Sequence, residues 1–249
     1  MALRMKNIAV RKAAAVLVED VDFTVDPGRL VAIIGPNGAG KTSLLRAGIG
    51  LEDHRGSVSV DGADWASLSP TERARKISYL PQKRPLAWPL KVRDIVALGR
   101  FAYGAAPRSL AGTDARAVDA AIASCSLEPF ADRAADTLSG GEEARLHCAR
   151  AFAAETPYIL ADEPATSLDP YHQRQVMKLF KGYTERGGGA AVVLHDMGLA
   201  AHYADDLLVL KQGRVVAEGP TASTLTADLI EDVYGVKARV TDDGVTVLP

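Results

Sequence analysis

Cysteine is nearly absent from this sequence, since only Cys125 and Cys148 occur in 249 residues. The two cysteines are far apart in the chain and form no C-x-x-C spacing, so the sequence supports neither a zinc site nor a disulfide framework. A free thiol of this kind packs as a small hydrophobic group, and we predict that both side chains are buried.

Long hydrophobic runs and an excess of either charge are also missing. No stretch approaches the roughly eighteen apolar residues of a membrane-spanning helix, and no apolar signal segment follows the charged N-terminus. The net charge of -2 gives no electrostatic reason to expect nucleic acid as a partner. We expect a cytoplasmic protein that contacts a membrane only indirectly, by docking on another protein.

The composition is that of an ordinary soluble protein, with 47% hydrophobic and 24% charged residues. A chain of 249 residues can bury one large α/β core and carry an additional lobe. Short apolar runs bounded by glycine, proline or charged residues predict the core strands. We predict strands over residues 21–26, 30–34, 57–60, 77–80, 157–162, 190–194, 207–210 and 214–217.

Between residues 92 and 154 these strand signals disappear and the sequence becomes rich in alanine. Val118, Ala121, Ile122 and Cys125 follow the i, i+3, i+4, i+7 spacing of a helix. We interpret this stretch as a helical lobe inserted into the α/β core. Elsewhere we predict a capped helix start at 69–72, a helix over 171–183, a helical tail over 221–235 and a final hairpin turning at Asp243-Gly244.

A glycine-rich stretch lies between the strand at 30–34 and a helical pattern. It consists of Gly35, Pro36, Asn37, Gly38, Ala39, Gly40, Lys41 and Thr42, and Ser43 follows in the helix. Such a loop wraps its N–H groups around a phosphate, and the helix N-terminus adds its positive dipole. Lys41 would reach the β- and γ-phosphates and Thr42 would ligate Mg²⁺. Taken alone, the stretch leaves a ligand-free turn as the alternative.

Two carboxylates, Asp162 and Glu163, end the apolar strand at 157–162. The carboxyl edge of an α/β sheet faces ligands, so Asp162 would lie beside the glycine-rich loop and hold Mg²⁺. Side chains alternate along a strand, so Glu163 would point differently and act as general base on a water molecule. A solvated pair at a strand end is the alternative.

A second anion site is indicated before the helical pattern that begins at residue 143. Ser139, Gly140, Gly141 and Glu142 offer a small hydroxyl and free N–H groups at a helix start. Serine and glycine also cap helices without any ligand, which is the alternative here. Two phosphate-binding helix starts in one chain are nevertheless an unusual coincidence.

In combination, these motifs resemble those of the nucleotide-binding subunit of an ABC transporter, and the resemblance extends from about residue 3 to the C-terminus. The fold that it implies is α/β, a P-loop NTPase core containing a mixed sheet with antiparallel strands, plus an inserted α-helical subdomain. The core would comprise residues 1–84 and 156–249, and the helical subdomain 85–155. The matching segments are 35–42 (Walker A), 158–163 (Walker B), 138–142 (signature), Gln82, 167–169 (D-loop) and His195.

The resemblance implies ATP and Mg²⁺ as cofactors and assigns roles to three further residues. Gln82 would approach Mg²⁺ or the attacking water, His195 would contact the γ-phosphate, and Asp169 would couple two sites. The catalytic residues would be Glu163, His195 and Gln82. The signature would contact ATP bound by a second copy, because a head-to-tail homodimer brings each signature to the partner's phosphate loop.

The segments 79–100 and 195–205 resemble those of importers of metal chelates, namely ferric siderophores, haem and cobalamin. This implies two transmembrane permease subunits docked through residues 82–100, a solute-binding protein reached through them, and a location on the inner face of the cell membrane. The alternatives are an exporter, an importer of another solute, a soluble ABC ATPase and a nucleotide sensor without catalysis.

The sequence departs from the family pattern in two places. An aromatic ring usually stacks on adenine near residues 10–13, where this chain has Val10, Arg11, Lys12 and Ala13. Contact with the base would then be aliphatic or a guanidinium stack from Arg11, which predicts weak base selectivity. Glu143 also stands where glutamine often follows the signature glutamate.

Overall fold

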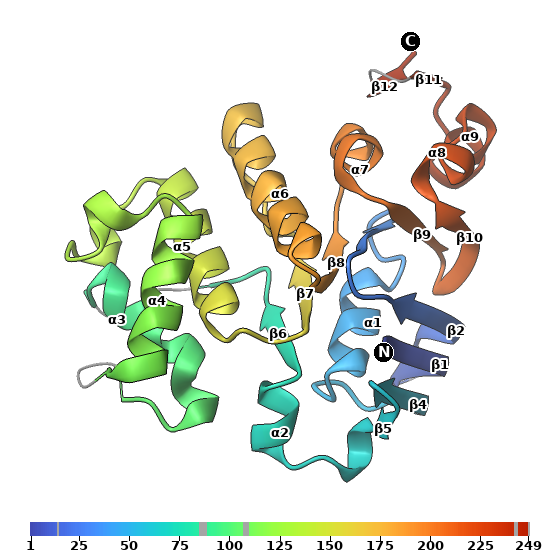
Figure 1. The fold of residues 1–249 in the computed structure, drawn as a ribbon. Helices are drawn as coiled ribbons and strands as arrows, with labels where there is room; N and C mark the ends of the chain where they lie inside the picture. Colours follow the sequence, from blue (N-terminus) through green and yellow to red (C-terminus); the bar gives the residue numbers. More distant parts are fainter. Residues whose placement is uncertain (14, 85–88, 107–109, 242–243, 249) are drawn as a thin grey trace.

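The computed structural model describes residues 1–13, 15–84, 89–106, 110–241 and 244–248 (Figure 1). A six-stranded sheet occupies the centre, in the order β10-β9-β3-β8-β7-β6. Its strands pair in parallel except for β10, which is antiparallel to β9 at one edge. The strands are β3 (Leu30–Ile34), β6 (Ile77–Leu80), β7 (Tyr158–Asp162), β8 (Gly189–Val193), β9 (Asp206–Lys211) and β10 (Arg214–Pro220).

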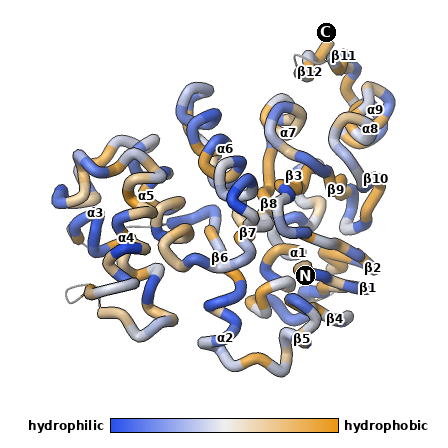
Figure 2. The backbone as a smooth tube through the Cα atoms, in the orientation of Figure 1, coloured by the Kyte–Doolittle hydropathy of each residue, from blue (hydrophilic) through white to orange (hydrophobic). Residues whose placement is uncertain are grey.

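Both faces of this sheet are buried along β3, β7, β8 and most of β9, which explains why these strands contain continuous apolar runs. In β3, Leu30, Ala32 and Ile34 belong to one hydrophobic cluster. Val31 and Ile33, which alternate with them, belong to the other. The central strands are accordingly among the most hydrophobic parts of the chain in Figure 2.

A second, antiparallel sheet has the order β2-β1-β4-β5. Its strands are β1 (Leu3–Lys12), β2 (Ala15–Val25), β4 (Arg55–Val60) and β5 (Ala63–Asp64). Helix α1 (Lys41–Gly48) packs against both sheets, and the end of the Met5 side chain of β1 occupies the space beside Gly48. The predicted hairpin at Asp61-Gly62 is confirmed, whereas β1 and the first half of β2 were not predicted.

Helices cover the other face of the central sheet, and three of them lie together at one side of the molecule (Figure 1). These three are α3 (Val92–Ala97), α4 (Gly112–Ser124) and α5 (Gly140–Ala153), joined by the 3-10 turns η2 (Leu98–Tyr103), η4 (Glu128–Phe130) and η5 (Ala135–Thr137). The helical character predicted for this stretch is confirmed, and both cysteines are buried in it. The proposed boundaries at 85 and 155 stay predictions.

The remaining predicted helices are present, but some differ in length from the prediction. The start at 69–72 is a capping box between Ser69 and Glu72, but the helix it begins has only five residues. The tail at 221–235 is divided into two short helices, and Asp243 of the final hairpin lies outside the described residues. The elements are η1 (Trp65–Ser67), α2 (Pro70–Ala74), α6 (Pro170–Glu185), α7 (Met197–Tyr203), α8 (Thr221–Thr224), α9 (Ala227–Tyr234), β11 (Ala238–Thr241) and β12 (Gly244–Val247).

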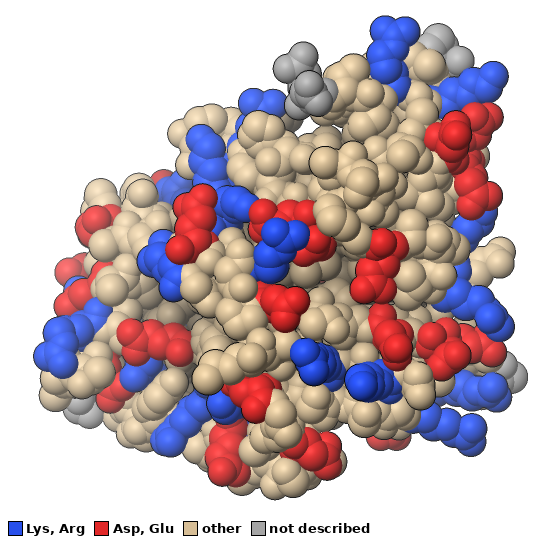
Figure 3. Space-filling view, turned by 45° about the vertical axis from the view of Figure 1, so that its right-hand side comes forward, with Lys and Arg blue, Asp and Glu red and all other residues tan. Residues whose placement is uncertain are grey.

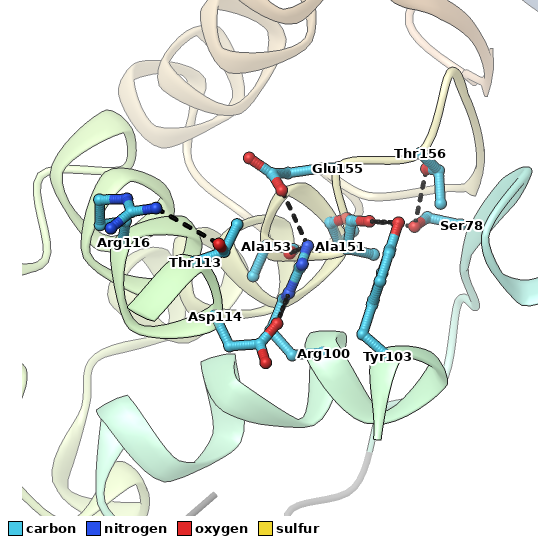
Figure 4. A network of polar contacts seen from close by, with 11 residues as sticks. Ser78, Arg100, Tyr103, Thr113, Asp114, Arg116, Ala151, Ala153, Glu155 and Thr156 are labelled. Atoms are coloured by element: carbon cyan, nitrogen blue, oxygen red, sulfur yellow. Dashed lines mark hydrogen bonds and ion pairs between the residues drawn. The ribbon is translucent and has the colours of Figure 1, made fainter. Parts of the chain in front are cut away.

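A buried arginine organises the packing of η2 against α4 and the end of α5 (Figure 4). The Arg100 side chain is 4% exposed and donates to Asp114 at 2.8 Å and to Glu155 at 2.9 Å. It also donates to the carbonyl of Ala153 at 3.0 Å and stacks on the Tyr103 ring. Three helical segments are therefore fixed to one guanidinium group.

Replacing Arg100 by alanine should lower the free energy of unfolding by about 2 kcal/mol, because charge-assisted hydrogen bonds and packing are lost together. Arg93→Ala is the matched control, since Arg93 pairs with Asp119 while both side chains are 40% or more exposed. That change should cost about 0–1 kcal/mol. Urea unfolding followed by circular dichroism measures both, and equal losses would contradict the organising role of Arg100.

Candidate functional site

The glycine-rich loop connects β3 to α1, as predicted, and two of its glycines are required by close backbone contacts. Gly35 and Gly40 have φ angles of 146° and 98°, where side chains are disfavoured. A Cβ atom at Gly35 would lie 2.0 Å from the Leu210 carbonyl oxygen, and one at Gly40 would lie 2.2 Å from that of Leu17. The loop is thus held between β2 and β9.

Lys41 folds back onto the loop that precedes it. Its Nζ atom donates to the carbonyl oxygens of Gly35 at 2.7 Å and Pro36 at 2.8 Å. Burial lowers the pKa of Lys41, and the nearby carboxylates of Glu163 and Asp162 oppose that shift. The ammonium group is therefore already placed inside the loop where a bound phosphate would need a positive charge.

Thr42 and Asp162 meet at the carboxyl edge of the sheet. The Thr42 hydroxyl, in the first turn of α1, donates to Asp162 Oδ1 at 3.0 Å, and Asp162 ends β7. Burial raises the pKa of Asp162, and the hydrogen bond from Thr42 opposes this. A hydroxyl and a carboxylate are hard oxygen ligands of the kind Mg²⁺ prefers, so the two side chains fit the predicted metal.

Glu163 owes its orientation to a turn and not to the alternation of a strand, which corrects the argument made from the sequence. Strand β7 ends at Asp162, and Glu163 follows with a φ angle of 50°. This left-handed conformation, uncommon for a residue with a side chain, is a form of strain often stored at functional sites. It directs Glu163 toward the ends of the neighbouring strands.

Three side chains converge on the Glu163 carboxylate. Gln82 Nε2 donates to Oε2 at 2.6 Å and the Thr166 hydroxyl donates to Oε2 at 2.9 Å. His195 Nε2 lies 2.6 Å from Oε1. The structure therefore brings together the three residues that were predicted to be catalytic and adds Thr166, which the sequence did not indicate.

These contacts keep Glu163 ionised. Burial by itself raises the pKa of Glu163, but the hydrogen bonds from His195, Thr166 and Gln82 and the charge of His195 together outweigh it, so that the pKa lies below its ordinary value. An ionised carboxylate at this edge can accept a proton from a water molecule, the role of a general base. At least one of the hydrogen bonds to the Glu163 carboxylate would have to break so that one oxygen could accept from that water.

The second predicted anion site begins α5. Ser139 and Glu142 form a capping box, in which Ser139 N donates to Glu142 Oε2 at 2.8 Å and Glu142 N donates to Ser139 Oγ at 3.4 Å. The N–H groups of Gly140 and Gly141 take no part in it. Among the residues that the structure describes, no hydrogen bond or ion pair joins this segment to the glycine-rich loop.

Asp169 is the N-cap of α6 and accepts from His172 N at 3.0 Å. The His172 ring covers Gly141 of α5, a contact that the sequence gave no reason to expect. Only the spacing of Asp169 and His172 at a helix start could have suggested their pairing. The first turn of α6 and the start of α5 are consequently in contact.

Glu143, the departure noted after the signature, lies beside His147 one turn further along α5. The distance from Glu143 Oε1 to His147 Nε2 is 3.5 Å. Burial lowers the pKa of His147 to about 3, with Arg150 and Arg84 adding to the effect. The imidazole is therefore neutral near pH 7, and the two groups form no ion pair there.

The phosphate loop, the Thr42 and Asp162 pair and the Glu163 cluster lie at one edge of a mostly parallel sheet. This arrangement defines the class as a P-loop nucleotide hydrolase. Among the residues described, no group of three or more histidine, cysteine or acidic side chains is arranged to hold a metal ion, and no helix is both long and apolar enough to span a membrane.

The comparisons with known proteins narrow this class. A family model described as ABC transporter matches residues 18–166. Hemin import ATP-binding protein HmuV of Rhodococcus jostii is 41% identical over 245 residues, covering 98% of this chain and 83% of that protein. The protein of the same name from Rhizobium meliloti is 38% identical over 247 residues, covering 96% and 93%.

Solved structures agree in fold. The ATP-binding subunit of an ABC transporter has a TM-score of 0.77 at 29% identity and covers 94% of both chains. The ADP conformation of MJ1267, an ATP-binding cassette of an ABC transporter, has a TM-score of 0.84 at 22% identity, covering 94% of this chain and 98% of that one. The chain belongs to the ABC transporter family, and it is an ATPase of that family.

Replacing Glu163 by glutamine should lower the rate of ATP hydrolysis at least about 100-fold, because an amide cannot accept the proton from water. ATP binding should persist, since Lys41 and Thr42 are unchanged. Phosphate release and equilibrium binding of ATP measure the two effects, with Glu128→Gln, an exposed glutamate in η4, as the control. Hydrolysis at the parent rate would exclude Glu163 as the base.

Proposed function

We propose that the chain is the ATP-hydrolysing subunit of an importer of hemin or of a chemically similar metal chelate. The observation that carries the proposal is the identity of 41% with a hemin import ATP-binding protein over 98% of the chain. That match extends well beyond the nucleotide-binding residues, so it includes surfaces on which a transport partner would dock. The relatives' names favour hemin over ferric siderophores and cobalamin.

Each residue of the site would have a defined task in hydrolysis. The loop from Gly35 to Thr42 would bind the phosphates, with Lys41 leaving its two carbonyl partners for the β- and γ-phosphate oxygens. Thr42 and Asp162 would hold Mg²⁺, with Gln82 beside them, and the ion would neutralise phosphate charge. Glu163 would take the proton of the attacking water.

His195 would complete this site. Its side chain is 42% exposed, and its Nε2 atom already faces the Glu163 carboxylate at 2.6 Å. A small movement of the ring would direct the same nitrogen to the γ-phosphate, where a donor stabilises the charge of the transition state. Glu163 would then be released to act as base.

A homodimer would bring the second anion site into use. The segment Ser139–Glu142 makes no described contact with the phosphate loop of its own chain, yet it presents the N–H groups of Gly140 and Gly141 at the start of a 14-residue helix. In a head-to-tail dimer each such helix start would meet the ATP of the partner. Asp169 would lie near the same interface.

The proposed membrane partner would dock in an apolar groove between the central sheet and the helical part. The groove has a volume of about 480 Å³ and includes Leu98, Gly99 and Phe101 of η2, with Phe101 78% exposed. The remaining lining residues are Pro70, Thr71, Ala74, Ile77, Ser78, Tyr79, Ala102, Arg150, Ala151 and Ala154. This groove shares only Leu98 and Gly99 with the segment 82–100 chosen from the sequence, of which residues 85–88, including Trp88, lie outside the described residues.

We place the chain at the inner face of the membrane, held there by two permease subunits through which it would serve a solute-binding protein. Nucleic acid remains an unfavoured partner. On the face shown in Figure 3, lysine and arginine side chains alternate with aspartate and glutamate, and a nucleic-acid surface would instead gather positive charge.

The import proposal predicts that the complex of this chain with its co-purified permease, reconstituted with this chain facing the lumen, takes up hemin into proteoliposomes only when ATP is enclosed inside them. Uptake should fall to background with Glu163→Gln, because transport would require hydrolysis. Vesicles offered a ferric siderophore or cobalamin are the comparison. Uptake of one of these in place of hemin would overturn the assignment of cargo.

The region around residues 10–13 predicts weak discrimination between ATP and GTP. Val10 is buried while Arg11, Lys12 and Ala13 are exposed, so this segment offers a base an aliphatic contact or a stack from a cationic side chain, and no aromatic ring. Stacking without matched hydrogen bonds discriminates poorly between bases. GTP should therefore be hydrolysed at a rate comparable to ATP, and Arg11→Ala should raise KM for both. A hundredfold preference for ATP in a side-by-side assay would contradict this.

A further inference from the structure

We propose that His172 is a positioning residue that joins the segment 167–169 to the start of α5, so that the second anion site and Asp169 move as one unit. His172 lies in the first turn of α6 and contacts both parts. The inference rests on the homodimer proposed above, in which the two parts face the nucleotide of the partner.

One end of the connection is a pair of hydrogen bonds to Asp169. Its Oδ1 atom accepts from the backbone N–H of His172 at 3.0 Å, and its Oδ2 atom lies 2.6 Å from His172 Nδ1. The first of these bonds lowers the pKa of Asp169 most, and the second adds to it. An ionised carboxylate only accepts, so Nδ1 carries the proton, and the ring orientation is fixed by the carboxylate.

The other end is a steric contact with α5. A Cβ atom built on Gly141 would lie 2.1 Å from His172 Cδ2 and 2.6 Å from Nε2. Since real Cβ atoms do not come so close to other atoms, the ring occupies the space that any side chain at Gly141 would need. Gly141 is buried although the residue before it is exposed.

Leu168 lies near Gly140, the other glycine at the start of α5, but leaves room for a Cβ atom there. A Cβ atom on Gly140 would lie 3.9 Å from Leu168 Cδ2, which is ordinary van der Waals distance. At the start of α5, the close packing is therefore confined to Gly141, which the His172 ring covers. The absence of a side chain at Gly141 would let a phosphate approach the start of α5, and it also makes room for the His172 ring.

The consequence concerns how a dimer would close. A displacement of Asp169 would be transmitted through the rigid imidazole to Gly141, because one ring nitrogen is bonded to the first and the ring edge presses on the second. The anion site and the interface aspartate of one chain would then engage the partner's ATP together. Without His172, the segment Ser139–Glu142 and Asp169 would have to be ordered separately, at a cost in conformational entropy.

The test uses the full chain in the Glu163→Gln background, where ATP is bound and not consumed. The ATP concentration for half-maximal dimerisation is measured by light scattering for that variant alone and with His172→Ala or His172→Asn added. His202→Ala, an exposed histidine on α7, is the matched control. Binding of ADP, followed by fluorescence of a labelled nucleotide, reports on the chain's own phosphate loop.

We expect His172→Ala to raise the half-maximal ATP concentration about tenfold and to lower the Hill coefficient of hydrolysis in the otherwise unmodified protein toward one. ADP affinity should stay within twofold. His172→Asn preserves a donor for Asp169 but is too short to cover Gly141, so it should resemble His172→Ala. The backbone cap of α6 survives both changes, which separates positioning from helix stability.

Four results would overturn the inference. Unchanged dimerisation with both variants would remove His172 from closure and leave the proposed function standing. Parent-like behaviour of His172→Asn alone would show that the contact with Gly141 is dispensable. Failure of Glu163→Gln itself to dimerise with ATP would overturn the dimer, and this inference with it. Loss of ADP affinity in His172→Ala would indicate damage to the core and count against a positioning role.

Discussion

The hydrogen bonds to the Glu163 carboxylate are the interaction on which the arrangement of the site depends. Gln82 follows β6, Glu163 follows β7 and His195 follows β8, so these contacts tie three neighbouring strand ends together. Because parallel strands all end at the same edge, a short side chain from each reaches the same point. The left-handed turn at Glu163 is what directs the carboxylate to that point.

The same edge also couples the core to the helical part. Gln82 stands at the beginning of the connection that leads from β6 toward α3, and its amide is held by a residue of the core. At the other end of that part, Arg100 and the hydroxyl of Ser78 hold the last turns of α5, with Ser78 donating to the Ala151 carbonyl at 3.1 Å. The hydrogen bond between Gln82 and Glu163 is exposed, whereas the one between Ser78 and Ala151 is buried. Rotation about the buried contact is therefore the motion that a change at Gln82 would produce most easily.

The features that the sequence could predict are those that depend on residues close together in the chain. The phosphate loop, the apolar strands and the capping box at Ser69 depend on neighbouring residues and were predicted with their type and position. Strand β1 was missed because its burial alternates irregularly, and its register with β2 is shifted in several places. The contacts of Gln82 and His195 with Glu163 and the cover of His172 over Gly141 join residues distant in sequence, which no local pattern encodes.

Binding of ATP to this site would be an exchange of contacts more than a gain of new ones. Lys41 now satisfies two carbonyl oxygens of its own loop, and the Thr42 hydroxyl satisfies Asp162. A phosphate would take Lys41 from neutral acceptors to anionic ones, which adds the attraction between opposite charges to the hydrogen bonds. Meanwhile the loop carbonyls would lose their donor, which offsets part of that gain. The free energy of binding would therefore be smaller than that of the new contacts alone, and removal of the γ-phosphate would take away part of what opposes the return to the contacts within the chain.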